Sequence, residues 1–356
     1  NSSSSDDATF SGVIDSSTGR FIKSGDGSQT LSGTNTYSGT TINGGTLKVS
    51  SDANLGTSPG STDVDNIILG GGTLNTTATF TLGTNRGITL TGNSTINVDS
   101  STTLTYGGVI TDNGSTFNIT KSGSGAIILS GTHTYDGDTT ISAGSLTLSG
   151  AFNSATDVVV SSGVTWDLQV NQTINSLNLD GTISNSAGAS ALTVTTTSDI
   201  GGNITTAGTQ TYTGAVTVSS DVTLTTTDSN VLFSATIEGS GSAESLTITA
   251  GTGSVTFANT IGATTALNML TVNATGGIYV AGNISTEDSL SDGLYYILIN
   301  SNTYFNDNLT YFNTNTPGSS GLWPYSTINV QDNSQIIYGD SETFNYRWSG
   351  YFTPNQ

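Results

Sequence analysis

Catalytic chemistry in this chain would depend on very few side chains. His133 is the single histidine and cysteine is absent, so a Ser–His–Asp triad would need His133, while thiol catalysis and thiolate metal sites are excluded. Asn35 and Gln210 occupy the position of His133 in two related segments of the chain. A position that accepts Asn, His and Gln is typical of a polar turn residue. We therefore predict no catalytic residue and no enzymatic activity.

Paired carboxylates are a second candidate for chemistry. Glycoside hydrolysis needs two facing carboxylates, and Asp136 with Asp138, or Glu287 with Asp288, could supply them. No motif surrounds either pair. The central part of the chain also has no basic residue of the kind that β-helical lyases use on acidic polysaccharides. A polysaccharide-active β-helix enzyme is therefore the third alternative for the function, behind two kinds of non-enzymatic role.

Calcium is the metal ion that these residue types could best hold. Asp63-Val-Asp65 and Asp136-Gly-Asp138 offer hard oxygen ligands. The calcium-binding pattern Gly-Gly-x-Gly-x-Asp does not occur in the chain, and a solvated turn explains both segments better. We expect no cofactor, with calcium as the alternative.

The charge balance and the lack of long apolar stretches exclude two further roles. The chain has 26 acidic residues against six Lys or Arg, a formal net charge of −20, and no Lys or Arg between Lys121 and Arg347. Nucleic acid would require clustered cations facing the phosphates. No stretch approaches the roughly 18 apolar residues of a membrane helix. We predict neither nucleic-acid binding nor membrane insertion.

An internal repeat becomes visible when the chain is aligned with itself. Residues 23–41 and 121–139 agree at 12 of 19 positions at an offset of 98 residues. The tetrad Thr-Tyr-x-Gly occurs at 36–39 and 134–137, and again at 211–214 in a more distant copy. The related regions extend over about 10–50, 106–149 and 201–286.

The repeats are built from short alternating apolar strings that Gly, Asn and Ser separate, as in Thr46-Leu-Lys-Val49 and Ser245-Leu-Thr-Ile248. Such a string predicts one strand, and the separators predict turns. One turn of chain cannot bury its apolar face alone, but stacked turns can. We predict an all-β fold, a parallel β-solenoid over residues 1–290. An array of immunoglobulin-like sandwiches is the alternative, although the repeating unit is much shorter than such a domain and lacks its Trp–Cys framework.

The two close copies resemble the autotransporter-associated β-strand repeat of bacterial passenger domains. The matching segments are Lys23-Ser-Gly-Asp-Gly27, Leu31-Ser-Gly-Thr-Asn-Thr-Tyr-Ser-Gly39 and Ile42-Asn-Gly-Gly-Thr-Leu47, with their equivalents at 121–146. The region 201–286 resembles the repeats of filamentous-haemagglutinin-type secreted adhesins. These resemblances imply a right-handed β-helix, export across a bacterial envelope to the cell surface or medium, and a role in adhesion or surface structure.

The composition changes near residue 290. Residues 290–356 contain 14 of the 27 aromatic residues and three of the four prolines. We interpret 291–356 as a cap over the open end of the solenoid, or as a segment that docks head to tail on a second copy. A glycan-binding platform is the third alternative for this segment. The residues that we expect to make such contacts are Tyr295, Tyr296, Trp323, Tyr325, Trp348 and Phe352.

Three Thr-x-Thr triplets, at 34–36, 132–134 and 209–211, are similar to those of ice-binding solenoids. An ice-binding face needs a regular ladder of many triplets, and these three are widely scattered. The sequence as a whole therefore predicts a non-enzymatic, extracellular structural or adhesin-like protein, a rod or a self-assembling fibre subunit at the cell surface. Its expected partners are further copies of itself and a host or neighbouring cell surface. A glycan-binding module that uses the C-terminal aromatics is the alternative.

Overall fold

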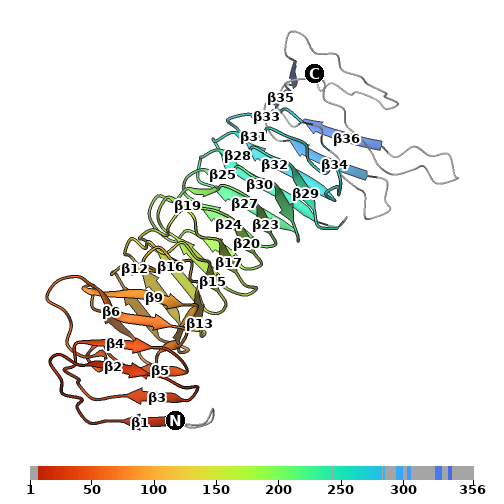
Figure 1. Ribbon diagram of the computed structural model, residues 1–356. Coiled ribbons are helices and arrows are strands. Elements are labelled where there is room, and N and C mark those ends of the chain that lie inside the picture. Colours follow the sequence, from red (N-terminus) through yellow and green to blue (C-terminus); the bar gives the residue numbers. More distant parts are fainter. Residues whose placement is uncertain are drawn as a thin grey trace. The chain divides into compact units, whose positions relative to one another are not determined.

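The computed structural model describes residues 7–241, 244–282 and 284, together with the backbone of four strands between 294 and 338. The chain divides into two compact units, Asn1–Leu192 (unit 1) and Thr193–Gln356 (unit 2). Both consist of short parallel strands stacked in successive turns of a solenoid (Figure 1). The predicted all-β parallel β-solenoid is confirmed, with about 13 turns in the two units together.

Unit 1 has three parallel sheets, here called 1a, 1b and 1c. Sheet 1a contains β1 (Asp7–Phe10), β3 (Ser28–Leu31), β5 (Thr46–Val49), β7 (Thr73–Thr76), β10 (Ser94–Val98), β13 (Ile119–Ser122), β15 (Thr139–Ile141), β17 (Val158–Val160) and β20 (Leu177–Leu179). Sheet 1b contains β8 (Phe80–Leu82), β11 (Thr103–Tyr106), β14 (Ala126–Leu129), β16 (Ser145–Leu148), β18 (Thr165–Leu168) and β21 (Thr182–Ser184). Sheet 1c contains β2 (Arg20–Lys23), β4 (Gly39–Ile42), β6 (Asp63–Gly70), β9 (Arg86–Gly92) and β12 (Ile110–Thr111).

Unit 2 repeats this arrangement with sheets 2a, 2b and 2c. Sheet 2a contains β23 (Ser198–Ile200), β26 (Val216–Val218) and β29 (Ile237–Gly239). Sheet 2b contains β24 (Ile204–Thr206), β27 (Val222–Thr226), β30 (Ser245–Gly251), β32 (Met269–Ala274), β34 (Leu294–Ile299) and β36 (Tyr325–Val330). Sheet 2c contains β25 (Gln210–Tyr212), β28 (Val231–Phe233), β31 (Val255–Phe257), β33 (Ile278–Val280), β35 (Thr303–Phe305) and β37 (Ile336–Tyr338). Two further strands are β19 (Gln172–Ile174) in unit 1 and β22 (Leu192–Val194) at the boundary.

The alternating strings form strands because alternate side chains point into the solenoid. In sheet 1b, Leu104, Ile127, Leu146 and Trp166 follow one another in register on successive turns, and all four are at most 2% exposed. Burial of each aliphatic side chain contributes about 1.5–3 kcal/mol relative to exposure. Stacked columns of this kind stabilise a fold in which each turn alone has no core.

Helical structure is nearly absent, as the sequence predicts. In the described part of the chain the single helical element is a 3-10 turn, η1 (Asp52–Leu55), between β5 and β6. No helix among the described residues is long and apolar enough to cross a membrane.

The two close sequence repeats lie on different sheets. The first copy begins in β2 of sheet 1c, whereas the second begins in β13 of sheet 1a. The repeat therefore encodes a pair of strands and the turn between them, not a fixed face of the solenoid. This explains why an offset of 98 residues preserves local contacts without being a whole number of turns.

The aromatic C-terminal segment contributes four strands whose backbone is described. β34 and β36 extend sheet 2b, and β35 and β37 extend sheet 2c, all in parallel register. Their side chains lie outside the described residues. The interpretation of 291–356 as a cap or assembly segment stays a prediction.

Candidate functional site

An open polar groove lies on the surface of unit 1. Its volume is about 470 Å³, which is within the range of small-ligand sites. The groove is lined by hydroxyl-bearing residues, two carboxylates, a proline and a glycine: Asp15, Ser17, Thr36, Ser38, Thr57, Ser58, Pro59, Gly60 and Asp63. We refer to this surface as the N-terminal groove.

The groove forms where three turns of the solenoid lack a strand. The connections 11–19, 32–38 and 50–62 occupy the place in their turns that sheet 1b occupies from β8 onward. They stack through backbone hydrogen bonds, since Thr36 N donates to Ile14 O and Thr57 N donates to Tyr37 O. Irregular connections can curve away from the core, so they leave a hollow that a flat sheet would not.

Polar side chains from successive turns form a ladder along the groove. The Thr36 hydroxyl donates to the carboxylate of Asp15 on the turn before. The Thr57 hydroxyl donates to Thr36 O at 3.1 Å, and the Ser38 hydroxyl donates to Gly19 O at 2.9 Å. These bonds fix the orientation of the side chains before any ligand arrives, which lowers the entropic cost of binding.

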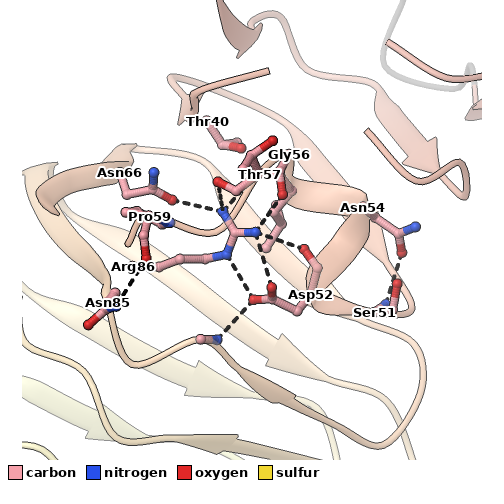
Figure 2. A network of polar contacts seen from close by, with 12 residues as sticks. Thr40, Ser51, Asp52, Asn54, Gly56, Thr57, Pro59, Asn66, Asn85 and Arg86 are labelled. Atoms are coloured by element: carbon pink, nitrogen blue, oxygen red, sulfur yellow. Dashed lines mark hydrogen bonds and ion pairs between the residues drawn. The ribbon is translucent and has the colours of Figure 1, made fainter. Parts of the chain in front are cut away.

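A buried arginine holds the longest connection in place. Arg86, at the start of β9, is fully buried, and its guanidinium forms an ion pair with Asp52 at 2.8 Å (Figure 2). The same guanidinium donates to Gly56 O, at 2.6 Å, and to Leu55 O, at 3.2 Å. Gly83 N donates to the same carboxylate oxygen as Arg86 Nε, Asp52 Oδ1, at 2.9 Å. The Arg86 side chain thereby satisfies carbonyls that would otherwise be buried without partners.

Two asparagines extend this network to the groove wall. Asn85 Nδ2 donates to Pro59 O at 3.0 Å (Figure 2). Asn66 accepts from Arg86 at 2.9 Å and donates through Nδ2 to Ser38 O, also at 2.9 Å. Side chains behind the groove therefore position the backbone of two of its three connections.

The connection that Arg86 anchors is an elaboration of the repeat. In the first copy, 17 residues (50–66) join β5 to the strand segment that begins at Ile67, and nine residues (149–157) join the equivalent strands of the second copy. Gly56 permits the tight path of the longer connection. Its φ is +83°, and a Cβ there would lie 2.2 Å from Tyr37 O.

The chemistry of the N-terminal groove favours binding over catalysis. Hydroxyls and carboxylates can accept and donate hydrogen bonds to a polyhydroxylated or cationic ligand. The lining contains no imidazole, amine or guanidinium. Acid–base chemistry in this lining would depend on the carboxylates of Asp15 and Asp63 alone.

His133 lies in the core rather than on a solvated turn. Its side chain is 2% exposed, and its Nδ1 accepts a hydrogen bond from Ile110 N at 3.2 Å. Asn35, the equivalent residue of the first copy, accepts from Ile14 N at 2.8 Å. Gln210 differs, because it is a buried residue of strand β25. The polar character of the position was predicted correctly, but its location on a turn was wrong for Gln210.

Burial also fixes the protonation state of His133. Desolvation lowers the pKa of His133 to about 4, so the ring is neutral at pH 7. The imidazole lies beside the rings of Tyr135 and Phe152, whose centroids are 6.3 and 6.1 Å from its own. A buried imidazole that accepts a backbone N–H is a structural residue.

Two buried lysines explain the Lys-Ser-Gly motif of the repeats. Lys23 Nζ donates to Ser24 O, Gly25 O and Gly44 O at 3.0, 2.7 and 3.1 Å. Lys121 Nζ makes the same three bonds in the second copy, at 2.9, 2.8 and 3.0 Å to the carbonyls of Ser122, Gly123 and Ala143. Each ammonium thus binds carbonyl oxygens on two successive turns of the solenoid.

The predicted carboxylate candidates do not assemble into one centre. Asp63 lines the N-terminal groove, whereas Asp136 lies beside Asp112 elsewhere in unit 1. Hydrogen bonding to Asp112 raises the pKa of Asp136, and burial raises the pKa of Asp138. Within the described ranges, no group of three or more His, Asp or Glu side chains could hold a metal ion. Glu287 and Asp288 lie outside the described residues.

The aromatic residues predicted for assembly or glycan contact are only partly placed. Tyr295 and Tyr296 lie in β34, and Tyr325 begins the neighbouring β36, opposite Leu294. Their side chains lie outside the described residues. The remaining residues, Trp323, Trp348 and Phe352, lie wholly outside them.

Comparison with known proteins agrees with the repeat structure. The passenger-associated-transport-repeat family matches residues 21–49 and 119–148, which contain the two buried lysines. A stretch of 141 residues is 36% identical to the adhesin BmaC autotransporter of Brucella suis biovar 1, and covers 39% of this chain. The chain spans only about 4% of that relative's length. No solved structure matches the chain. The predicted resemblance to autotransporter passenger repeats is confirmed.

Proposed function

We propose that this chain is part of a secreted, surface-exposed protein of the adhesin type, without enzymatic activity, and that it contacts its target through the N-terminal groove. The matches to passenger repeats and to an autotransporter adhesin support the class of protein. The hydroxyl and carboxylate lining of the groove supports a binding role for this surface.

The use of the cationic side chains is the observation that carries the proposal. Among the described residues, Lys23 and Lys121 hold turn carbonyls, Arg20 holds the carbonyls of sheet 1c, and Arg86 holds the 50–62 connection. Lys48 pairs with Asp7 on the surface. Four of the five described Lys and Arg side chains thus maintain the fold, and the fifth, Lys48, is paired on the surface.

Adhesion of coated beads tests the proposal. Gly60 lines the groove, has no Cβ neighbour within 4 Å and has no left-handed backbone, so Gly60→Trp fills the groove without disturbing the fold. Ser154 is exposed in the equivalent, shorter connection of the second copy, so Ser154→Trp is the matched control. We expect beads with the unaltered chain and with Ser154→Trp to bind an epithelial monolayer or a bacterial lawn, and beads with Gly60→Trp to bind several-fold less.

The outcomes separate two parts of the proposal. Equal binding by all three proteins would remove the groove from the contact surface while keeping the adhesive role. Binding no better than that of beads coated with albumin, on both surfaces, would overturn the adhesive role itself.

Self-association and glycan binding are finer proposals that involve the C-terminal aromatic segment. For head-to-tail assembly, we expect electron microscopy at increasing protein concentration to show filaments, and single particles throughout would contradict it. For glycan binding, we expect Trp323→Ala or Trp348→Ala to abolish retention on a glycan array.

A further inference from the structure

Two Asn-Gly pairs occur in the chain, Asn43-Gly44 and Asn113-Gly114, and their surroundings differ. An asparagine before glycine is prone to deamidation, because no side chain shields the backbone nitrogen that attacks the asparagine amide. Asn113 and Gly114 are both exposed and lie in the connection between β12 and β13. Their φ angles are +54° and +80°, as in a type I′ turn, and Ser115 N donates to Asp112 O at 3.1 Å.

The side chain of Asn113 is free to react. Within the part of unit 1 that the structure describes, its amide makes no hydrogen bond. No atom lies within 4 Å of the position that a Cβ would take on Gly114, so the peptide group between the two residues has room to rotate. Rotation brings the backbone nitrogen of Gly114 towards Cγ of Asn113.

Asp112 places a carboxylate against the nitrogen that attacks. Gly114 N donates to Asp112 Oδ1 at 3.2 Å, which is within the reach of a general base. Asp112 is only 3% exposed, and its other carboxylate oxygen accepts from Asp136 N at 3.3 Å. The following turn of the solenoid therefore holds this carboxylate in position.

The pair Asn43-Gly44 lacks these features. It lies in the turn between β4 and β5, where Asn43 N donates to Lys23 O at 2.9 Å and Lys23 Nζ donates to Gly44 O at 3.1 Å. Bonds on both sides of the pair thus restrict its rotation. Among the side chains that the structure describes, no carboxylate accepts a hydrogen bond from Gly44 N.

We propose that Asn113 is a site of self-catalysed deamidation, with Asp112 as the general base. Gly114 N forms a bond to Cγ of Asn113 while its proton passes to the carboxylate of Asp112. The bond between Cγ and Nδ2 breaks, and ammonia leaves with the proton that Asp112 returns. Water then opens the cyclic succinimide at either carbonyl, which leaves aspartate or isoaspartate at position 113.

The reaction alters the contact between two successive turns. It adds a negative charge directly beside Asp112, and isoaspartate also adds a methylene group to the backbone of the turn. Asp112 accepts from Asp136 N on the following turn, so the altered connection holds that turn less firmly. The pair thus gives unit 1 a slow covalent change that needs no enzyme.

Peptide mapping of the folded full chain during incubation in neutral buffer tests the proposal. Trypsin places the two pairs in separate peptides, 24–48 and 87–121, so mass spectrometry follows both in one sample. A sample digested at the start corrects for deamidation during digestion. We expect Asn113 to be converted several-fold faster than Asn43 in the folded chain, and both to react at similar rates in guanidinium chloride.

Asp112→Asn tests the base, because an amide oxygen can still accept from Gly114 N but cannot take its proton. Asp138→Asn is the matched control, since the carboxylate of Asp138 accepts from Asn118 Nδ2 in the same connection. Circular dichroism verifies that both variants keep the β-fold, and fragment ions separate position 112 from position 113. We expect Asp112→Asn to slow the conversion of Asn113 several-fold and Asp138→Asn to leave the rate unchanged.

Each part of the proposal has a result that would overturn it. Equal rates at Asn113 and Asn43 in the folded chain, or no conversion of Asn113, would remove the site. Equal rates in Asp112→Asn and the unaltered chain would remove the role of Asp112 as a base. We expect hydrogen exchange at Asp136 N to accelerate as Asn113 is converted, and unchanged exchange there would overturn the effect on the following turn.

Discussion

Ile110 N donates a hydrogen bond to Nδ1 of His133 at 3.2 Å, across two successive turns of the solenoid. In the first repeat the same cross-turn bond runs from Ile14 N to Asn35 Oδ1. An imidazole and an amide thus perform one structural task, and only the imidazole can lose its acceptor by taking up a proton. The substitution of Asn by His introduces a titratable group at a buried position of the second copy.

Acid should therefore destabilise unit 1 through His133. Its folded-state pKa, about 4, lies below the ordinary value of 6.5, so stability is unaffected above pH 6.5 and falls as the pH drops from 6.5 to 4. The loss amounts to about 3 kcal/mol at the lower end. We expect His133→Asn to abolish this component in urea unfolding at a series of pH values, since Asn35 shows that an amide fits. Identical pH dependence in the two proteins would contradict the assignment.

Arg86→Leu should loosen the N-terminal groove. The substitution leaves Asp52 without its cation and removes the donors of Gly56 O and Leu55 O. Loss of one partner of a fully buried ion pair costs about 3–5 kcal/mol, and we expect the lower end here because the Asp52 side chain is 28% exposed. We expect faster hydrogen exchange in residues 53–60 and a lower denaturant midpoint. Arg86→Lys should recover only part of the stability, because an ammonium cannot reproduce the guanidinium fork. Unchanged hydrogen exchange of residues 53–60 in Arg86→Leu would show that the connection is stable without the Arg86 network.

Lys121→Met should destabilise the second repeat. Lys121 is 3% exposed and its ammonium donates to three carbonyls, so its removal leaves several turn acceptors without a donor. Hydrogen bonds to charged groups contribute about 1.5–3 kcal/mol each, and we expect a net loss of about 2 kcal/mol in equilibrium unfolding. Lys48→Met is the control, because the Lys48–Asp7 pair is exposed and such pairs contribute about 1 kcal/mol or less. Similar losses for both variants would argue against a carbonyl-binding role.

The strands and their parallel stacking could be predicted because alternation and repetition are local properties of the sequence. Leu146, for example, belongs to a string whose period alone places it inside. The network of Arg86 could not be predicted, since Arg86 and Asp52 are 34 residues apart and meet through the stacking of turns. The register of β27, β30 and β32 does have a signal in the sequence, the interval of 24 residues between Thr223, Thr247 and Thr271.

The three Thr-x-Thr triplets at 34–36, 132–134 and 209–211 do not lie on one sheet. Residues 34–36 and 132–134 belong to connections of unit 1, and 209–211 reaches into sheet 2c, where Thr211 lies opposite Leu232. The three triplets therefore form no ladder on one sheet, which agrees with their wide spacing in the sequence. Register, which depends on the length of every intervening turn, decides which triplets align.

Phe233→Ala should unfold unit 2 locally. Phe233 is 1% exposed and stacks between Tyr212 and Phe257, with ring centroids 5.0 and 5.5 Å away and nearly parallel planes. Removing a buried phenylalanine typically costs about 3–5 kcal/mol, and here it interrupts a column that spans three turns. Because turns contact mainly their neighbours, we expect hydrogen exchange to accelerate in β25, β28 and β31 more than in unit 1. Leu232→Ala, on the half-exposed outer face of the same strand, should change exchange little. A uniform acceleration throughout the chain would instead indicate that the solenoid unfolds as a single cooperative block.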